Sequence, residues 1–233
     1  MNITIDHLSD GAARAEGVTV IIDVFRAYSV ESYAFARGAK KIYPIANQED
    51  AYALKRKHPS FLLAGERKAQ KPKGFDYGNS PTQLEFEDLS GKTLIHTTSA
   101  GTQGIIAAAK ADRILVAALV NAKATAQYIQ QLGAKRISLV CMGYENRIPT
   151  EEDTICAEYI YSVLQQLPYD KQAAIKLMRE TSGKRFFVPE DQSFAPMHDF
   201  ELCTQFDCFS FAMEIQCDEN GMCYTKQIPI DLY

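Results

Sequence analysis

Short apolar runs alternate with helical patterns along the first 143 residues, and this rhythm constrains the fold more than any other feature of the chain. The runs are rich in β-branched residues, and the segments between them have the spacing of amphipathic helices. Repeated β–α units of this kind are typical of a mostly parallel sheet that helices cover. We expect strands at residues 2–5, 18–24, 41–45, 61–64, 93–97, 113–117 and 136–142.

The pattern changes in the last third of the chain. Thr150 with Asp153 predicts a capping box and a long helix, which a second helix follows. Apolar and polar residues then alternate over 209–217, and Glu219-Asn220-Gly221 predicts a turn into a returning strand. The fold class is therefore α/β, with three α/β/α layers, a largely parallel sheet and a C-terminal β-hairpin at about 208–230. We expect residues 1–233 to form a single domain, with two closely packed lobes as the alternative.

Composition and charge exclude several classes of protein. A hydrophobic content of 46% with 23% charged residues is ordinary for a water-soluble chain with a full core. The net charge of −4 argues against nucleic acid as a partner. No signal peptide or membrane span is visible, so we expect a cytoplasmic protein, no membrane partner and a small-molecule substrate. Six cysteines in such a chain predict reduced thiols, and a homodimer is a reasonable expectation.

Polar side chains follow the predicted strands at the ends where ligands bind in open parallel sheets. Each group comes from a different strand, so these groups should meet along one edge of the sheet. In chain order they are Asp23 with Arg26, Glu66 with Arg67, Thr97-Thr98-Ser99, Asn121, and Glu151-Glu152-Asp153 after Gly143.

The loop at residues 65–81 is too long for an ordinary β–α connection, and long ordered loops tend to be functional. Its Lys and Arg residues could attract an anion. Glu66 and Asp76 supply the oxygen ligands that Mg²⁺ prefers. A solvated basic loop without function is the alternative.

Two further motifs fit a phosphate. Asp23 could bind a metal while Arg26 clamps phosphoryl oxygens, although the two could also form a structural salt bridge. The turn at residues 97–104 could present backbone N–H groups to a phosphate or sulfonate, or could simply cap a helix. A haloacid dehalogenase mechanism is disfavoured because Phe25 stands where a second aspartate is needed.

Cysteine chemistry offers rival interpretations. Cys141 and Arg147 match the C-x5-R spacing of cysteine phosphatases. Against that mechanism, Glu145 would place negative charge in the phosphate cradle, and Cys141 continues an apolar strand. The sequence evidence for a zinc site is also weak, because the candidate ligands are spaced more widely than in a zinc knuckle. These candidate ligands are Cys203, Cys208, Cys217 and Cys223.

Six motifs together resemble the 2-phosphosulfolactate phosphatase (ComB) family in order and spacing over roughly residues 1–165. They are residues 22–27, 64–67, 74–81, 97–102, 120–122 and 151–153, of which Gly-Phe-Asp-Tyr-Gly-Asn-Ser-Pro at 74–81 is the most specific. The resemblance implies an α/β/α protein that needs Mg²⁺. It also implies hydrolysis of 2-phospho-3-sulfolactate to 3-sulfolactate and phosphate, a step towards coenzyme M. Ser99-Ala100 replaces the more common Thr-Asn of this family, which puts the substrate in more doubt than the reaction class.

The sequence thus leads to a Mg²⁺-dependent phosphatase hypothesis with named residues. The catalytic residues would be Asp23, Arg26 and Glu66, and the metal ligands, direct or through water, would be Asp23, Glu66, Asp76 and Asp153. The substrate-binding residues would be Arg67, Asn79, Ser80, Thr98, Ser99, Gly101, Thr102 and Asn121. The carboxylate or sulfonate of the substrate would be bound by Arg67, Lys71 and Asn121. The alternatives are a non-catalytic module that binds small anions and a cysteine-dependent phosphatase that uses Cys141 and Arg147.

Overall fold

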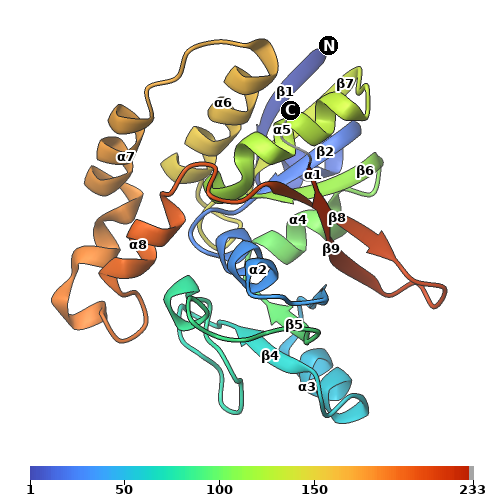
Figure 1. Ribbon diagram of the computed structural model, residues 1–233, viewed down its shortest axis with the longest axis vertical. Helices are drawn as coiled ribbons and strands as arrows, with labels where there is room; N and C mark the ends of the chain where they lie inside the picture. Colours follow the sequence, from blue (N-terminus) through green and yellow to red (C-terminus); the bar gives the residue numbers. More distant parts are fainter. Residues whose placement is uncertain (231–233) are drawn as a thin grey trace.

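Nine strands form one mixed sheet in the computed structural model, which describes residues 1–230 (Figure 1). The strand order is β1-β7-β2-β6-β8-β9-β3-β5-β4. The strands are β1 (Asn2–His7), β2 (Gly17–Ile22), β3 (Lys41–Pro44), β4 (Leu62–Gly65), β5 (Thr93–Thr97), β6 (Ala111–Ala117), β7 (Arg136–Cys141), β8 (Phe211–Cys217) and β9 (Cys223–Pro229).

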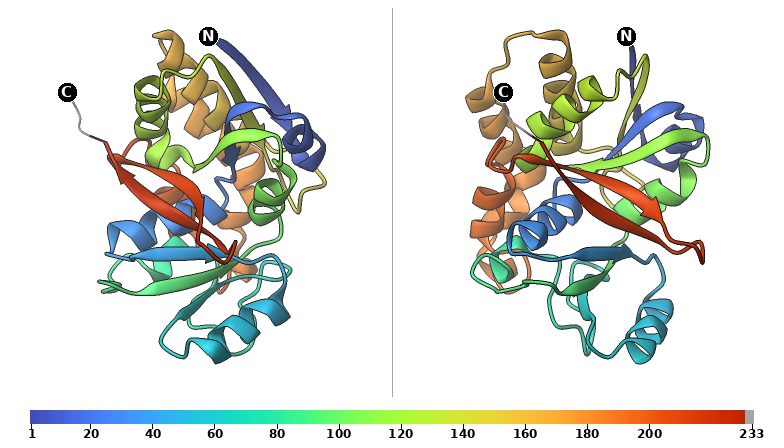
Figure 2. Two further views of the ribbon diagram at one scale, coloured as in Figure 1. Left: turned by 90° about the vertical axis from the view of Figure 1, so that its right-hand side faces the viewer. Right: turned by 45° about the vertical axis from the view of Figure 1, so that its right-hand side comes forward.

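Helices cover both faces of the sheet. Helices α1 and α4 pack together on one face, and α5 and α6 pack together on the other (Figure 2). The α-helices are α1 (Leu8–Arg14), α2 (Ala27–Ala36), α3 (Gln48–Lys57), α4 (Gly101–Ala107), α5 (Ala122–Gln131), α6 (Glu151–Gln165), α7 (Lys171–Glu180) and α8 (Met197–Cys203). Four 3₁₀ segments complete the elements: η1 (Pro81–Gln83), η2 (Leu119–Asn121), η3 (Ser182–Phe187) and η4 (Pro189–Asp191).

The C-terminal hairpin joins two parallel half-sheets. Strands β1, β7, β2 and β6 pair in parallel, as do β3, β5 and β4, and the antiparallel strands β8 and β9 lie between the two sets. Because β6 and β3 would otherwise be open edges, the hairpin pairs backbone groups that would need another partner. The C-terminal hairpin therefore forms as the sequence predicts, but it lies in the middle of the sheet.

The core follows from the strand composition. Strand β2 is buried from Val18 to Ile22, as expected of a strand that helices cover on both faces. A smaller apolar cluster lies between α3 and the half-sheet of β3, β4 and β5, around Tyr43, Leu63 and Ile95. In the part of the chain that the structure describes, no helix has the length and apolarity needed to cross a bilayer.

Local signals in the sequence had mixed outcomes. The seven expected strands are confirmed, and Asn47 caps α3 by accepting hydrogen bonds from two backbone N–H groups. Thr150 is the N-cap residue of α6, but its side chain makes no capping hydrogen bond, so the predicted capping box is wrong. The expectation of reduced thiols is wrong for Cys217 and Cys223, which form a disulfide. These two cysteines face each other at the end of the β8–β9 ladder, where the short turn brings them together.

Candidate active site

A small cavity of about 60 Å³ lies where the two half-sheets meet. Segments after β2 and β7 come to it from one half-sheet, and segments after β4 and β5 come from the other. This is the edge at which the carboxyl ends of parallel strands gather ligand-binding groups. Its polar lining includes Asp23, Arg26, Glu66, Asn79, Ser99 and Arg185.

Asp23 is held at the end of β2 by two backbone groups. Its Oδ1 accepts a hydrogen bond from Ala27 N (3.2 Å), and its Oδ2 accepts one from Gly101 N (3.1 Å). The side chain is buried, and burial, with added repulsion from Glu152 and Glu66, raises the pKa of Asp23 to about 6. Asp23 and Glu66 therefore bring negative charge into the cavity, beside the guanidinium groups of Arg26 and Arg185.

Glu66 reaches the cavity because the chain turns sharply at Gly65. This glycine has a φ of +138°, and a Cβ there would lie 2.0 Å from the carbonyl oxygen of Thr97. The Glu66 carboxylate accepts hydrogen bonds from Ser99 N (3.0 Å), Ser99 Oγ (2.7 Å) and Ala69 N (2.9 Å). The loop after β4 and the turn after β5 are thus tied to one carboxylate.

Two backbone amides of the turn at residues 97–104, which was expected to present such groups to an anion, already have partners in the protein. The N–H groups of Ser99 and Gly101 donate to protein carboxylates, as described above, so they are engaged before any phosphate arrives. The hydroxyl groups of Thr98 and Thr102 lie 3.2 Å apart and bond to each other, and both side chains are buried. Of these residues, Ser99 lines the cavity.

Asp153 connects the ends of two strands. Its Oδ1 accepts a hydrogen bond from Val24 N and its Oδ2 accepts one from Gly143 N, each at 2.8 Å. Burial raises the pKa of Asp153 well above its ordinary value, and the nearby charges of Glu152 and Asp23 raise it further. Asp153 therefore lies behind Asp23, where it fixes the segments after β2 and β7.

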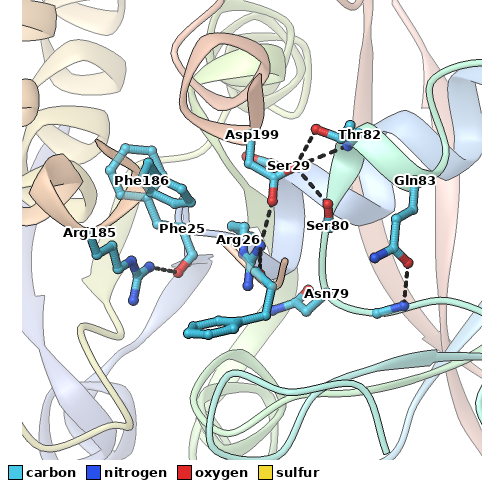
Figure 3. A network of polar contacts seen from close by, with 12 residues as sticks. Phe25, Arg26, Ser29, Asn79, Ser80, Thr82, Gln83, Arg185, Phe186 and Asp199 are labelled. Atoms are coloured by element: carbon cyan, nitrogen blue, oxygen red, sulfur yellow. Dashed lines mark hydrogen bonds and ion pairs between the residues drawn. The ribbon is translucent and has the colours of Figure 1, made fainter. Parts of the chain in front are cut away.

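Arg26 is positioned by a carboxylate from the far end of the chain (Figure 3). Its Nη1 donates to Asp199 Oδ2 and to the carbonyl oxygen of Phe194 (2.7 Å), and the ion pair is buried. Asp199 also accepts hydrogen bonds from Ser80 Oγ (2.7 Å), Thr82 N (3.1 Å) and Thr82 Oγ1 (2.6 Å). The sequence expectation missed Asp199, and it gave Ser80 a substrate-binding role that this network does not display.

A second buried chain of polar contacts leads to Asn79, which lines the cavity. Its Oδ1 lies 3.3 Å from His96 Nε2, and His96 Nδ1 lies 2.9 Å from Glu31 Oε1. All three side chains are buried. Because each contact fixes the next, Glu31 and His96 orient the Asn79 amide toward the cavity.

Three predicted site residues are placed elsewhere. Asp76 accepts a hydrogen bond from Leu63 N (2.8 Å) and lies 3.7 Å from the Lys55 ammonium, so it braces β4 instead of lining the cavity. Asn121 is fully buried, and its Oδ1 accepts a hydrogen bond from Ala118 N (3.0 Å). Arg67 donates to the backbone carbonyls of Glu66 and Ala46 and faces a neighbouring depression.

The geometry contradicts the cysteine mechanism. Cys141 is fully buried in β7, and burial raises the pKa of its thiol well above the ordinary value, whereas a nucleophilic thiol needs a lowered pKa. The Arg147 side chain is 79% exposed and pairs with Glu145 instead of facing the thiol. The zinc alternative fails as well, because Cys217 and Cys223 are joined by a disulfide.

The donor set fits a hard divalent cation with few protein ligands. Within residues 1–230, no group of three or more His, Cys, Asp or Glu side chains is arranged to hold a metal ion. Mg²⁺ commonly binds one or two carboxylates and completes its shell with water and substrate phosphate. Asp23 and Glu66 match that requirement, since both are buried, line the same cavity and repel each other.

Comparisons with known proteins identify the family of the chain. The family model described as 2-phosphosulpholactate phosphatase matches residues 3–217. A protein of Bacillus subtilis named "Probable 2-phosphosulfolactate phosphatase" is 31% identical over 202 residues, which is 86% of this chain and 88% of that protein. The protein of the same name from Thermotoga petrophila is 32% identical over 218 residues, covering 90% and 92% of the two chains.

A third relative is more similar over a shorter stretch. The protein from Caldicellulosiruptor saccharolyticus, which has the same name, is 40% identical over 161 residues, or 67% of this chain and 64% of that protein. The family match spans nearly all of the described chain and includes every segment that forms the cavity. The resemblance expected from the motifs is thereby confirmed, and the chain belongs to the 2-phosphosulfolactate phosphatase family.

Proposed function

We propose that the protein is a Mg²⁺-dependent phosphatase that hydrolyses 2-phospho-3-sulfolactate, or a similar small anionic phosphate monoester, to 3-sulfolactate and phosphate. One observation carries this proposal: the small cavity is lined both by two buried carboxylates, Asp23 and Glu66, and by two guanidinium groups, those of Arg26 and Arg185. Carboxylates favour a divalent cation, and guanidinium groups favour the oxygens of anionic groups such as a phosphate ester's phosphoryl and acid groups. The names of the relatives point to the same substrate.

Asp23 and Glu66 would hold the cation. When bound there, Mg²⁺ supplies positive charge that stabilises the phosphoryl transition state and lowers the pKa of a coordinated water. A cation would also relieve the repulsion that raises the pKa of Asp23. Asp153 takes a positioning role in this proposal because, unlike Asp23 and Glu66, it does not line the cavity, and its two oxygens accept hydrogen bonds from the segments after β2 and β7.

The chain's own donors would orient the phosphoryl group. Arg26 is fixed by Asp199, so its guanidinium enters the cavity already ordered and loses little entropy when substrate binds. The Asn79 amide, which His96 orients, is a further donor on the cavity wall, whereas the Ser99 hydroxyl already donates to Glu66. Preorganised donors of this kind stabilise the charge that develops on phosphoryl oxygens.

The reaction is tested by measuring phosphate release from 2-phospho-3-sulfolactate, with protein stripped by EDTA and then supplied with Mg²⁺. Release that needs Mg²⁺ supports the proposal. Release that persists in EDTA would contradict the metal requirement, and binding of the ester without release would favour a non-catalytic anion-binding module. The cytoplasmic location and the homodimer stay predictions, and sedimentation velocity measures the second directly.

A further inference from the structure

A second and larger cavity, of about 360 Å³, adjoins the reaction cavity. The two share four residues of their lining: Arg26, Ala69, Tyr144 and Arg185. A cavity of about 60 Å³ suits a phosphoryl group but leaves little room for the rest of a substituted lactate. Because the walls are shared, the second cavity is the space into which the remainder of a bound substrate extends.

The second cavity has polar walls whose groups are not paired within the protein. Four buried atoms that belong to its lining make no well-formed hydrogen bond among the described residues: Thr150 Oγ1, Glu152 Oε2, Ser182 Oγ and Arg185 Nε. Burial raises the pKa of Glu152, and the Ser182 and Thr150 hydroxyls lie close enough to its carboxyl to lower that pKa in part. Buried polar groups in native proteins are nearly always paired, so several orphans around one cavity indicate a ligand or ordered water. Three of the four atoms, on Thr150, Ser182 and Arg185, can donate to an anion.

Arg185 lies between the two cavities and is held there by contacts that leave Nε without a partner. Its Nη2 donates to the carbonyl oxygen of Phe25 (2.9 Å), as Figure 3 shows. The guanidinium carbon lies 5.1 Å from the ring centre of Phe186 and 5.8 Å from that of Tyr144. Aromatic faces and a carbonyl thus fix the plane of the group.

Buried acidic groups balance the charge of Arg185. The carboxylates of Glu152 and Asp23 both favour its charged form, although burial, which is the larger effect, lowers its pKa. Glu152 lines the second cavity as well, and its carboxylate is the charge that most favours the ionised guanidinium. A charged donor that is fixed, desolvated and only partly paired is suited to recognising an anion.

We infer that the second cavity receives the sulfonate arm of the substrate, and that Arg185 is the residue that discriminates for it. This inference rests on the proposed function. The sulfonate of 2-phospho-3-sulfolactate stands one methylene farther from the phosphoryl-bearing carbon than the carboxylate does, so it is the group that reaches beyond the small cavity. Its oxygens accept a charge-assisted hydrogen bond from Arg185, whose Nε has no partner in the protein.

The test compares two substrates that differ at the sulfonate alone, 2-phospho-3-sulfolactate and phospholactate. Arg185→Met is expected to lower the ratio of kcat/KM for 2-phospho-3-sulfolactate to kcat/KM for phospholactate by roughly 10- to 100-fold. This factor corresponds to the loss of one charge-assisted hydrogen bond. Lys184→Met is the matched control, because Lys184 belongs to the same 3₁₀ segment but is exposed. It removes the same charge and should leave the ratio unchanged.

An equal loss on both substrates, or no loss, would overturn the inference. Calorimetric binding of 3-sulfolactate and lactate gives a second readout that needs no turnover, and Arg185→Met should weaken only the binding of 3-sulfolactate. If Arg185→Met fails to fold, Arg185→Lys is used, which keeps the charge but loses the planar fork and should lower the ratio less. Wild-type protein that releases no phosphate refutes the proposed function, whereas an active wild type with an unchanged ratio in the variant refutes only this inference.

Discussion

Replacing Asp199 by alanine should destabilise the protein far more than an average substitution. The Asp199 side chain is fully buried and accepts hydrogen bonds from Arg26, Ser80 and Thr82. Removing it leaves the buried Arg26 guanidinium without its counter-charge. Breaking one side of a buried ion pair costs about 3–5 kcal/mol. In a chain of 233 residues that corresponds to a fall in Tm of roughly 6–20 °C, at about 2–4 °C per kcal/mol.

The assay is thermal and urea unfolding followed by circular dichroism, with Asp6→Ala as the control. Asp6 pairs with Arg14 on the surface, where the arginine side chain is 63% exposed, and such pairs contribute only about 0–1 kcal/mol. The double variant Arg26→Met/Asp199→Leu should recover much of the loss, because neither charge is then left unpaired. The reasoning would be refuted if the double variant lost as much stability as the two single substitutions together. It would also be refuted if Asp199→Ala were as stable as Asp6→Ala.

Three further predictions concern pH, backbone and cysteine. Hydrogen bonds to Glu201 and then to Glu85 raise the pKa of His198. The stabilising effect of these contacts is therefore complete below the ordinary histidine pKa and is lost as pH rises through the higher folded value. His198→Gln should flatten this part of the stability profile in urea titrations; an unchanged profile would contradict it. Gly65→Ala should abolish phosphate release and lower Tm. Gly91→Ala is the control, because its added Cβ meets nothing within 4 Å, and it should lower the free energy of unfolding by only about 1–2 kcal/mol through backbone strain. Equal losses of stability in the two variants would refute the argument. Cys141→Ala should leave kcat unchanged and cost about 1 kcal/mol, and loss of turnover in a folded Cys141→Ala protein would restore the cysteine mechanism.

The sequence predicts strands well where the signal is local, and less well where distant pairing decides. Alternation and apolar runs indicate each strand separately, so all seven strands of the first part are found. The place of the β8–β9 hairpin depends instead on which open edges it meets, β6 and β3. No local pattern encodes that choice. The disulfide between Cys217 and Cys223 follows from the same ladder, and composition alone argues against it.

The candidate site also contains residues that the sequence predicts and residues that only distant contacts bring to it. Asp23, Glu66 and Ser99 were predictable because they directly follow strands whose carboxyl ends meet. Asp199, in α8, and Arg185, in η3, lie more than 100 residues along the chain from Arg26 and Phe25, to which they are hydrogen-bonded. Neither residue stands in a recognisable motif, and other charged residues such as Lys184 and Glu201 lie close to them in the sequence, so no local pattern assigns them a partner.

Residues near a strand end can also face away from the site. Asp76 and Asn121 stand in motifs that favour a functional role. In the structure, however, the carboxylate of Asp76 and the amide oxygen of Asn121 each accept a hydrogen bond from a nearby backbone N–H group. Side-chain direction depends on how the loop returns to the sheet, and here Tyr77 pairs with Ala64 and turns Asp76 toward Leu63. Spacing in the sequence therefore finds the loop but not the side chains that it presents.

Metal-dependent phosphate release by paired carboxylate variants tests the central claim most directly. Protein stripped with EDTA is titrated with Mg²⁺ while phosphate release from 2-phospho-3-sulfolactate is followed, for the wild type and for Asp23→Asn, Glu66→Gln and Asp76→Asn. We expect Mg²⁺ to restore release in the wild type and in Asp76→Asn, whose carboxylate lies outside the cavity, and not in the other two. Full recovery by folded Asp23→Asn and Glu66→Gln proteins would contradict the account.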